Sequence, residues 1–218
     1  MGQRPVRRLL AAQPGLRAAW TEVGPASVHD ERNSAVVRDP ARLPAGLRDR
    51  VATVTAGLAD PRALAPAIEG GDAVLIALGP RGRGPTTVHT TAMRSILQAM
   101  ADVSARRVLL VSAAGMVADA GDGPLTRYVL KPLVLRPLLK NSYADLAESE
   151  RLLRASGLDW TIVRPSRLLD GGPTGRYRTA VDLNLRGGRS TTRADLAACM
   201  LELAGDPASA GHVVSVAT

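Results

Sequence analysis

Aromatic residues, lysine and cysteine are all scarce in this chain of 218 residues. It contains two Trp, three Tyr and no Phe, so a core must be built from Leu, Val, Ala, Ile and Met. Lysine occurs only at Lys131 and Lys140, and arginine therefore supplies nearly all of the positive charge. The single cysteine, Cys199, excludes a disulfide bond within the chain and suits a reducing compartment. We expect it to be a buried structural thiol on the apolar face of a helix.

Long apolar runs are also absent. No stretch reaches the roughly 18 residues that a transmembrane helix needs. The arginine-bearing start lacks the apolar region of a signal peptide, so we expect a cytoplasmic protein. The net charge of +8 is compatible with nucleic acid, an anionic membrane surface or a phosphorylated cofactor. The arginines are scattered, with no stacking aromatics between them, which argues against nucleic acid. We expect a small-molecule substrate and no nucleic-acid, membrane or metal partner, and we leave the oligomeric state open.

The apolar residues that are present fall into short runs separated by helical patterns. They make up 45% of the chain, enough for the core of one globular domain. Runs that are apolar throughout indicate strands buried on both faces, and their alternation with helices predicts a parallel sheet covered on both sides. The expected strands cover 35–37, 51–54, 73–78, 108–111, 161–163 and 212–216, and the expected helices 60–68, 86–100, 141–156 and 195–204.

The segment 124–139 departs from this alternation. It mixes leucines, valines and a tyrosine with Arg127, Lys131 and Arg136, and it is interrupted by Pro132 and Pro137. We interpret it as a packed excursion between a strand and a helix. The alternative is a lid over a substrate pocket or a surface for a partner.

A set of short motifs runs in order from Val36 to Ala197. The motifs are VVRDPARLP (36–44), GGDAVLIALG (70–79), PTTV (85–88), VLLVSAAG (108–115), SGLDWTIVRP (156–165), TGRY (174–177) and TTRADLA (191–197). In order and spacing they resemble the atypical short-chain dehydrogenases/reductases with an NAD(P)H-binding, NmrA-like domain, and they are similar to biliverdin-IXβ/flavin reductase-like proteins. The resemblance implies an α/β fold, a Rossmann-like doubly wound parallel sheet.

The resemblance also implies which residues bind the cofactor. Arg38 stands where such proteins meet the adenosine ribose, and an arginine there favours the 2′-phosphate of NADP over the hydroxyl of NAD. It is otherwise a solvated arginine at a strand end. The expected cofactor is therefore NADP(H) rather than NAD(H). The next binding loop follows a strand end, where open α/β sheets bind ligands, and consists of Leu78, Gly79, Pro80 and Arg81.

Two further strand ends are implied to face the nicotinamide. Ser112, followed by Ala113, can hydrogen-bond a substrate oxygen in related reductases, and we expect it to be the catalytic residue; otherwise it is a turn or cap serine. Pro165 and Ser166 resemble the segment beside the nicotinamide carboxamide. Arg164 is expected to be structural.

The helix 141–156 lacks the usual proton-donating pair. Ordinary short-chain dehydrogenases use Tyr-x-x-x-Lys, in which the lysine lowers the pKa of the tyrosine. Here Tyr143 is followed by Ala147 at the lysine position, and Leu146 and Glu150 stand where flavin-reductase-like relatives tend to carry histidines. Such relatives pass hydride directly to a flat ring and need no tyrosine. No side chain is therefore predicted as the proton donor.

The beginning of the chain departs further. The family opens with a buried strand, a Gly-x-x-Gly-x-x-Gly loop and a helix, and the loop and helix N-terminus hold the pyrophosphate. The early glycines, Gly2, Gly15 and Gly24, have the wrong spacing, and arginines interrupt the one apolar run. We therefore set residues 1–34 apart, with the first strand, loop and helix missing, from a Rossmann-like domain at 35–218. The segment is long enough for the missing strand, loop and helix, but its residues do not suit them. One hypothesis is that the segment is translated in an altered reading frame, and that the correct frame resumes near Ser34.

Three functions remain open from the sequence. The first is an NADP-dependent oxidoreductase that passes hydride from NADPH to a flavin, a quinone or a similar flat acceptor. The second is a non-catalytic NAD(P)-binding regulator, which the missing Tyr-x-x-x-Lys pair favours. The third is a family member that cannot bind the cofactor.

Overall fold

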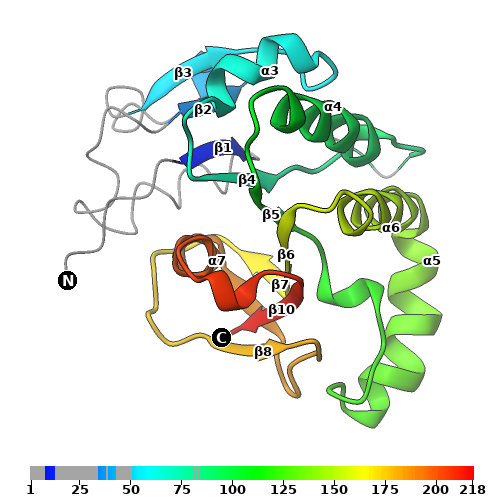
Figure 1. Ribbon diagram of the computed structural model, residues 1–218. Helices are drawn as coiled ribbons and strands as arrows, with labels where there is room; N and C mark the ends of the chain where they lie inside the picture. The colour runs from blue at the N-terminus through cyan, green and yellow to red at the C-terminus, as the bar shows by residue number, and fades with distance from the viewer. Residues whose placement is uncertain (1–7, 13–33, 38, 43–50, 81, 83) are drawn as a thin grey trace.

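A central eight-stranded sheet organises the molecule (Figure 1). The computed structural model describes residues 8–12, 34–37, 39–42, 51–80, 82 and 84–218. Seven neighbouring strands are parallel, and β8 runs antiparallel beside β10 at one edge. From one edge to the other the strands are β3 (Ala52–Thr55), β2 (Ser34–Val37), β1 (Arg8–Ala12), β4 (Ala73–Ala77), β5 (Arg107–Val111), β6 (Asp159–Pro165), β10 (His212–Ala217) and β8 (Arg178–Val181).

The strand β1 corrects our expectation that the first strand is missing. It lies between β2 and β4, with Leu10 opposite both Ala35 and Leu75. The strand begins at Arg8, so a single arginine stands at its first position and Leu9, Leu10, Ala11 and Ala12 follow. A central strand needs only these few apolar residues, because both neighbours supply its hydrogen bonds. The expected glycine loop and helix would fall within 13–33, outside the described residues.

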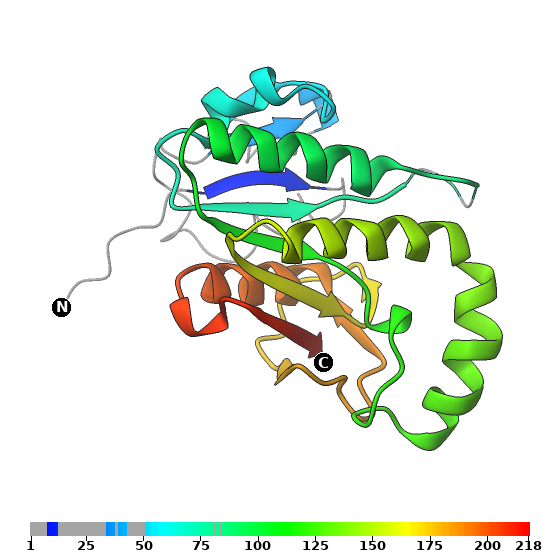
Figure 2. The ribbon, with the colours of Figure 1, turned by 45° about the vertical axis from the view of Figure 1, so that its right-hand side comes forward.

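Helices cover both faces of the sheet, as the alternating pattern predicts (Figures 1 and 2). One face carries α3 (Pro61–Ile68), α4 (Val88–Asp102) and α6 (Lys140–Arg154), which pack with Val74, Ile76 and Leu110. The other face carries α7 (Arg193–Ala204), which packs with Leu75 and Leu109. Successive residues of one strand thus point into different cores, and the Rossmann-like doubly wound α/β fold is confirmed.

The buried end of α7 holds two of the family-like motifs together. Asp195 accepts hydrogen bonds from the Thr174 backbone N–H and hydroxyl, at 2.8 and 2.6 Å, and from the Gly175 N–H at 3.1 Å. The strand β9 (Ser190–Thr192) leads into this helix and pairs with β7 (Arg167–Leu169). The motifs at 174–177 and 191–197 therefore stabilise the fold by hydrogen-bonding to each other. Burial raises the pKa of Cys199, on the same helix, to about 12, in keeping with a structural thiol.

A helical arm (residues 125–138) replaces the packed excursion that we expected. Its π-helical part, η3 (Thr126–Leu135), runs into α5 (Arg136–Leu138), and Figure 2 shows the arm standing along one side of the body. Pro132 lies inside this π-helical part, and because it has no backbone N–H it leaves one hydrogen bond of the ladder unmade. Most of the large apolar side chains of the arm are exposed rather than packed. Within the described residues, no helix is both long and apolar enough to cross a bilayer.

Candidate functional site

Three loops that the sequence singles out lie side by side at the carboxyl ends of the central strands. Leu78, Gly79 and Pro80 follow β4, Ser112 and Ala113 follow β5, and Ser166 follows Pro165 at the end of β6. These strands are neighbours and parallel, so their carboxyl ends lie side by side. This is the edge at which open α/β sheets bind ligands. Arg38 and Arg81, the two arginines assigned to the cofactor, lie outside the described residues.

The Ser112 hydroxyl donates to a buried carboxylate on α6. Its Oγ lies 2.6 Å from Glu150 Oε1, and both residues are buried. Glu150 in turn accepts two hydrogen bonds from Arg164, from Nε to Oε1 at 3.2 Å and from a terminal guanidinium nitrogen to Oε2 at 2.7 Å. Arg154 reaches Oε2 from one helical turn away, at 3.2 Å. Arg164 is thus structural, as expected, and it joins β6 to α6 behind the loop of Ser112.

The charge state of Glu150 fixes the direction of the Ser112 hydrogen bond. Burial alone raises the pKa of Glu150, but hydrogen bonds and charge from Arg164, with help from Ser112 and Arg154, outweigh burial and hold that pKa below its ordinary value. An ionised carboxylate only accepts, so the serine must donate its one proton to it. The lone pairs of Ser112 Oγ remain available. Ser112 can therefore accept a hydrogen bond from a ligand but cannot donate one in this arrangement.

A second buried carboxylate ties the loop after β4 to the same helix. Asp145 accepts the backbone N–H groups of His89 and Thr90, both at 2.9 Å, and so caps α4 from outside that helix. His89 Nδ1 lies 3.0 Å from the same carboxylate, and His89 Nε2 lies 3.2 Å from the Leu78 carbonyl. The two ring nitrogens of His89 thus face two different oxygens, one on α6 and one at the end of β4. His89 therefore anchors the chain at the start of the predicted cofactor loop.

The hydrogen bonds to Asp145 decide its ionisation. Burial by itself raises the pKa of Asp145, but the bonds from Thr90 and His89 prevail and lower it. Sequence reasoning missed both His89 and Asp145. The signal was available, because Asp145 and Glu150 occur on the same face of α6 as Leu146 and Leu153, which are buried. An acid within the apolar stripe of a helix indicates a buried partner.

Tyr143 lies beside the loop after β5 but lacks the means to act as an acid. A side-chain carbon at Gly115 would collide with the Tyr143 hydroxyl, so the glycine permits this contact. Burial raises the pKa of Tyr143, and Ala147, one turn along, supplies no cation to lower it. The tyrosine is therefore a weaker proton donor than one paired with lysine.

The described carboxyl ends of β4 and β5 offer a ligand a hydrogen-bond acceptor beside open space. Ser112 Oγ offers lone pairs to an amide N–H, and side chains at Gly82 or Gly84 would meet no protein atom, which leaves open space beside that loop. In the described part of the chain, no three His, Cys, Asp or Glu residues are grouped to hold a metal ion. The part of the site that would take the pyrophosphate falls among residues that the structure does not describe.

Comparison with known proteins places this arrangement in a class, that of the NAD(P)H-binding domains with a Rossmann-like fold. A family model described as NAD(P)H-binding matches residues 20–207. The chain belongs to this NAD(P)H-binding family. The match includes residues 20–34, which we had set apart from the domain.

Solved structures share the fold over nearly the whole chain. A short-chain dehydrogenase/reductase from Veillonella parvula DSM 2008 is 18% identical with a TM-score of 0.77, over 97% of this chain and 94% of that one. A wide-type short-chain dehydrogenase/reductase from the same organism, in complex with NADP, is 18% identical with a TM-score of 0.76, over 97% and 93%. A Streptococcus pneumoniae TIGR4 protein, with a proposed NADH-flavin reductase activity, is 20% identical with a TM-score of 0.73, over 97% and 99%.

Proposed function

We propose that this protein is an NADP-dependent oxidoreductase that reduces a flavin, a quinone or a similar flat acceptor. One observation carries the proposal: the loops after β4, β5 and β6 meet at one edge, where Ser112 is oriented by Glu150 and Tyr143 has no lysine partner. This edge can hold a nicotinamide without placing a tuned acid beside it. An acceptor that takes hydride directly needs no such acid.

The described residues bind and orient rather than move a proton. Ser112 Oγ accepts from an amide N–H of the ligand, and His89 fixes the Leu78 carbonyl at the neighbouring loop. NADPH, when bound, supplies the hydride, and the acceptor gains two electrons. The additional proton comes from water, because among the described residues Ser112 donates its proton to Glu150 and the raised pKa of Tyr143 makes it a weak donor. One NADPH and one proton thus yield NADP⁺ and the two-electron-reduced acceptor.

The choice of NADPH over NADH rests on Arg38. Its guanidinium can pair with a 2′-phosphate, and the excess of positive charge favours an anionic cofactor. The Veillonella parvula relative with NADP is consistent with this choice. The Streptococcus pneumoniae relative bears on the acceptor class only through its proposed activity.

A non-catalytic NAD(P)-binding regulator is the second candidate. The observation that favours it is the hydrogen bond that the Ser112 hydroxyl donates to Glu150. Because of this bond, Ser112 cannot donate to a substrate oxygen. The test is titration of the full chain with NADPH and NADH, followed by turnover assays with free flavins and soluble quinones. Binding with turnover supports the oxidoreductase, and binding without turnover on the whole panel supports the regulator. Failure to bind either cofactor contradicts both.

A further inference from the structure

The helical arm (residues 125–138) carries a concentration of exposed apolar side chains. Leu125 is 73% exposed, Leu133 68% and Tyr128 66%. The other exposed large apolar residues of the arm are Val129, Leu130, Val134 and Leu138. Isolated exposed leucines are ordinary, but a continuous set on one element marks a contact surface.

The arm is firmly attached by its opposite side. Lys131 is buried and its Nζ lies 2.7 Å from the Val117 carbonyl and 2.7 Å from Asp122 Oδ1. Leu135, one turn further on, packs close to Gly115 of the loop after β5. The residues at 131 and 135 therefore face the body at a helical spacing. The arm is therefore anchored on the body. Its apolar side chains are exposed although the helix itself is held in place.

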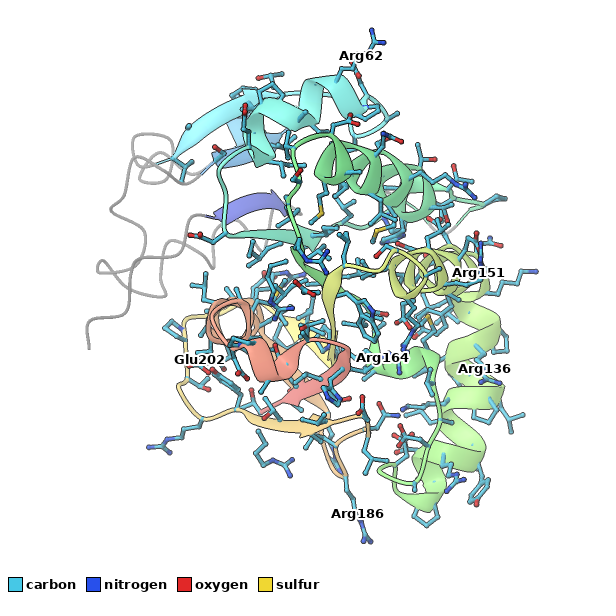
Figure 3. The ribbon with its side chains drawn as sticks, viewed as in Figure 1. Arg62, Arg136, Arg151, Arg164, Arg186 and Glu202 are labelled. Carbon is cyan, nitrogen blue, oxygen red and sulfur yellow. The ribbon has the colours of Figure 1, made fainter. Side chains whose placement is uncertain are left out.

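The charges on the arm and at Lys140, the first residue of α6 directly after it, are all of one sign. No Asp or Glu occurs between Asp122 and Asp145, whereas Arg127, Arg136 and Lys140 lie within this stretch. Within the described part of the chain, none of these three cations forms an ion pair with a carboxylate, and Arg127 instead lies over the Tyr128 ring. Figure 3 shows Arg136 on the arm, well away from Arg62 on α3. The surface therefore combines apolar side chains with unneutralised positive charge.

In place of the sequence-based expectation of no membrane partner, we propose that the arm docks this protein on an anionic lipid surface. An amphipathic helix with cations on its flanks lies in the interface of such a membrane, its apolar residues among the acyl chains and its cations at the phosphates. The absence of a membrane-spanning helix among the described residues does not bear on this kind of contact, which needs only one helix face. A second copy of the chain is a poorer occupant, because two arms in contact would bring their unpaired cations together.

Docking would place the candidate site at the membrane surface. The arm touches Gly115 through Leu135, and Gly115 follows Ser112 by three residues. A lipid-dissolved flat acceptor would then reach the site without crossing water. The docking itself does not depend on the proposed reaction, and it is measured without any cofactor.

Vesicle co-sedimentation of the full chain tests the proposal. We expect binding to vesicles of phosphatidylcholine with phosphatidylglycerol, and little binding to phosphatidylcholine alone. Leu125→Gln/Leu133→Gln should weaken binding about a hundredfold, since each buried leucine contributes about tenfold. Arg136→Gln/Lys140→Gln should weaken it about thirtyfold, since each cation near the surface contributes about fivefold. The matched controls, Leu183→Gln and Arg62→Gln/Arg176→Gln, change exposed residues on other elements and should stay within about twofold.

The outcomes distinguish lipid docking by the arm from general stickiness and from a contact between copies. All of the variants alter exposed side chains, so thermal melts should agree with the unsubstituted protein, and this confirms that they fold. Equal binding to both kinds of vesicle would overturn the proposal, as would equal losses in the arm variants and the controls. If the chain binds no vesicles, and sedimentation shows a dimer that Leu125→Gln/Leu133→Gln dissociates, the arm is a contact between copies and the lipid proposal is wrong.

Discussion

At the scale of single residues, the Glu150 carboxylate accepts hydrogen bonds from the Ser112 hydroxyl, from Arg164 and from Arg154 at once. A serine held in this way contributes one hydrogen bond to a ligand, worth roughly 0.5–1.5 kcal/mol. We expect Ser112→Ala to lower kcat/KM for NADPH-dependent flavin reduction by about tenfold. Tyr143→Phe should leave the same activity within a few-fold, because its pKa is raised and no lysine assists it. A folded, NADPH-binding Tyr143→Phe protein without activity would contradict the proposed mechanism.

The ion pair between Glu150 and Arg164 should make stability depend on acidity. The pKa of Glu150 in the folded protein is below the ordinary 4.5, so the pair stabilises the fold above that value and the stabilisation is lost as the pH falls through the lowered pKa. Glu150→Gln leaves Arg164 buried without its counter-charge, which should cost about 3 kcal/mol near neutral pH. Thermal melts from about pH 7 to about pH 3 should therefore converge for the two proteins on the acid side. A constant gap across the range would show that the Glu150 charge contributes nothing.

The proposed preference for NADPH over NADH rests on one arginine, Arg38. Arg38→Ala should weaken NADPH binding by about tenfold or more, since a charge-assisted phosphate bond contributes roughly 1.5–3 kcal/mol, and should change NADH binding little. Fluorescence titration with each cofactor measures both affinities. Equal losses for NADPH and NADH would remove the basis for assigning a 2′-phosphate contact to this residue.

At the scale of elements, α6 connects the candidate site. Asp145 fixes the start of α4 and, through His89, the loop after β4, whereas Glu150 fixes the loop after β5 and the end of β6. The sequence predicted this helix and the strand ends from their apolar periodicity. It could not predict which buried acid meets which partner, because His89 and Asp145 are 56 residues apart and are brought together only by packing.

The segment that follows β1 should limit cofactor affinity. Its sequence lacks the Gly-x-x-Gly-x-x-Gly loop whose backbone N–H groups hold a pyrophosphate. Replacing residues 13–33 with a family-like glycine loop and helix, while keeping β1, should raise NADPH affinity by at least about tenfold, because each restored charge-assisted bond contributes roughly 1.5–3 kcal/mol. Calorimetric titration and thermal melts with and without NADPH measure the change. A matched replacement in which the glycines become alanines is the control, and no difference between the two would show that the chain already has another phosphate site.

At the scale of the whole molecule, strands that are apolar on both faces predict the parallel sheet and its two helical layers from the sequence. Among the features that escaped prediction, three have a clear physical reason. The strand β1 is only five residues long and opens with an arginine, so its apolar signal is weak. The edge strand β8 is mostly exposed and lacks an apolar pattern. The arm has the composition of a packed segment, and composition does not reveal that its leucines are left uncovered.

The position of β1 has a consequence for biosynthesis. It is the first described strand to leave the ribosome, yet one of its two partners, β4, begins 65 residues after it, from Arg8 to Ala73. Until that partner is made, β2 is the available neighbour, and the pair exposes an open edge to other nascent chains. β2 and β3 join the rest of the sheet only through β1. A product that begins downstream of Ala12 would therefore emerge with its sheet divided into two parts, each with an unpaired edge, and would depend on chaperones from the start.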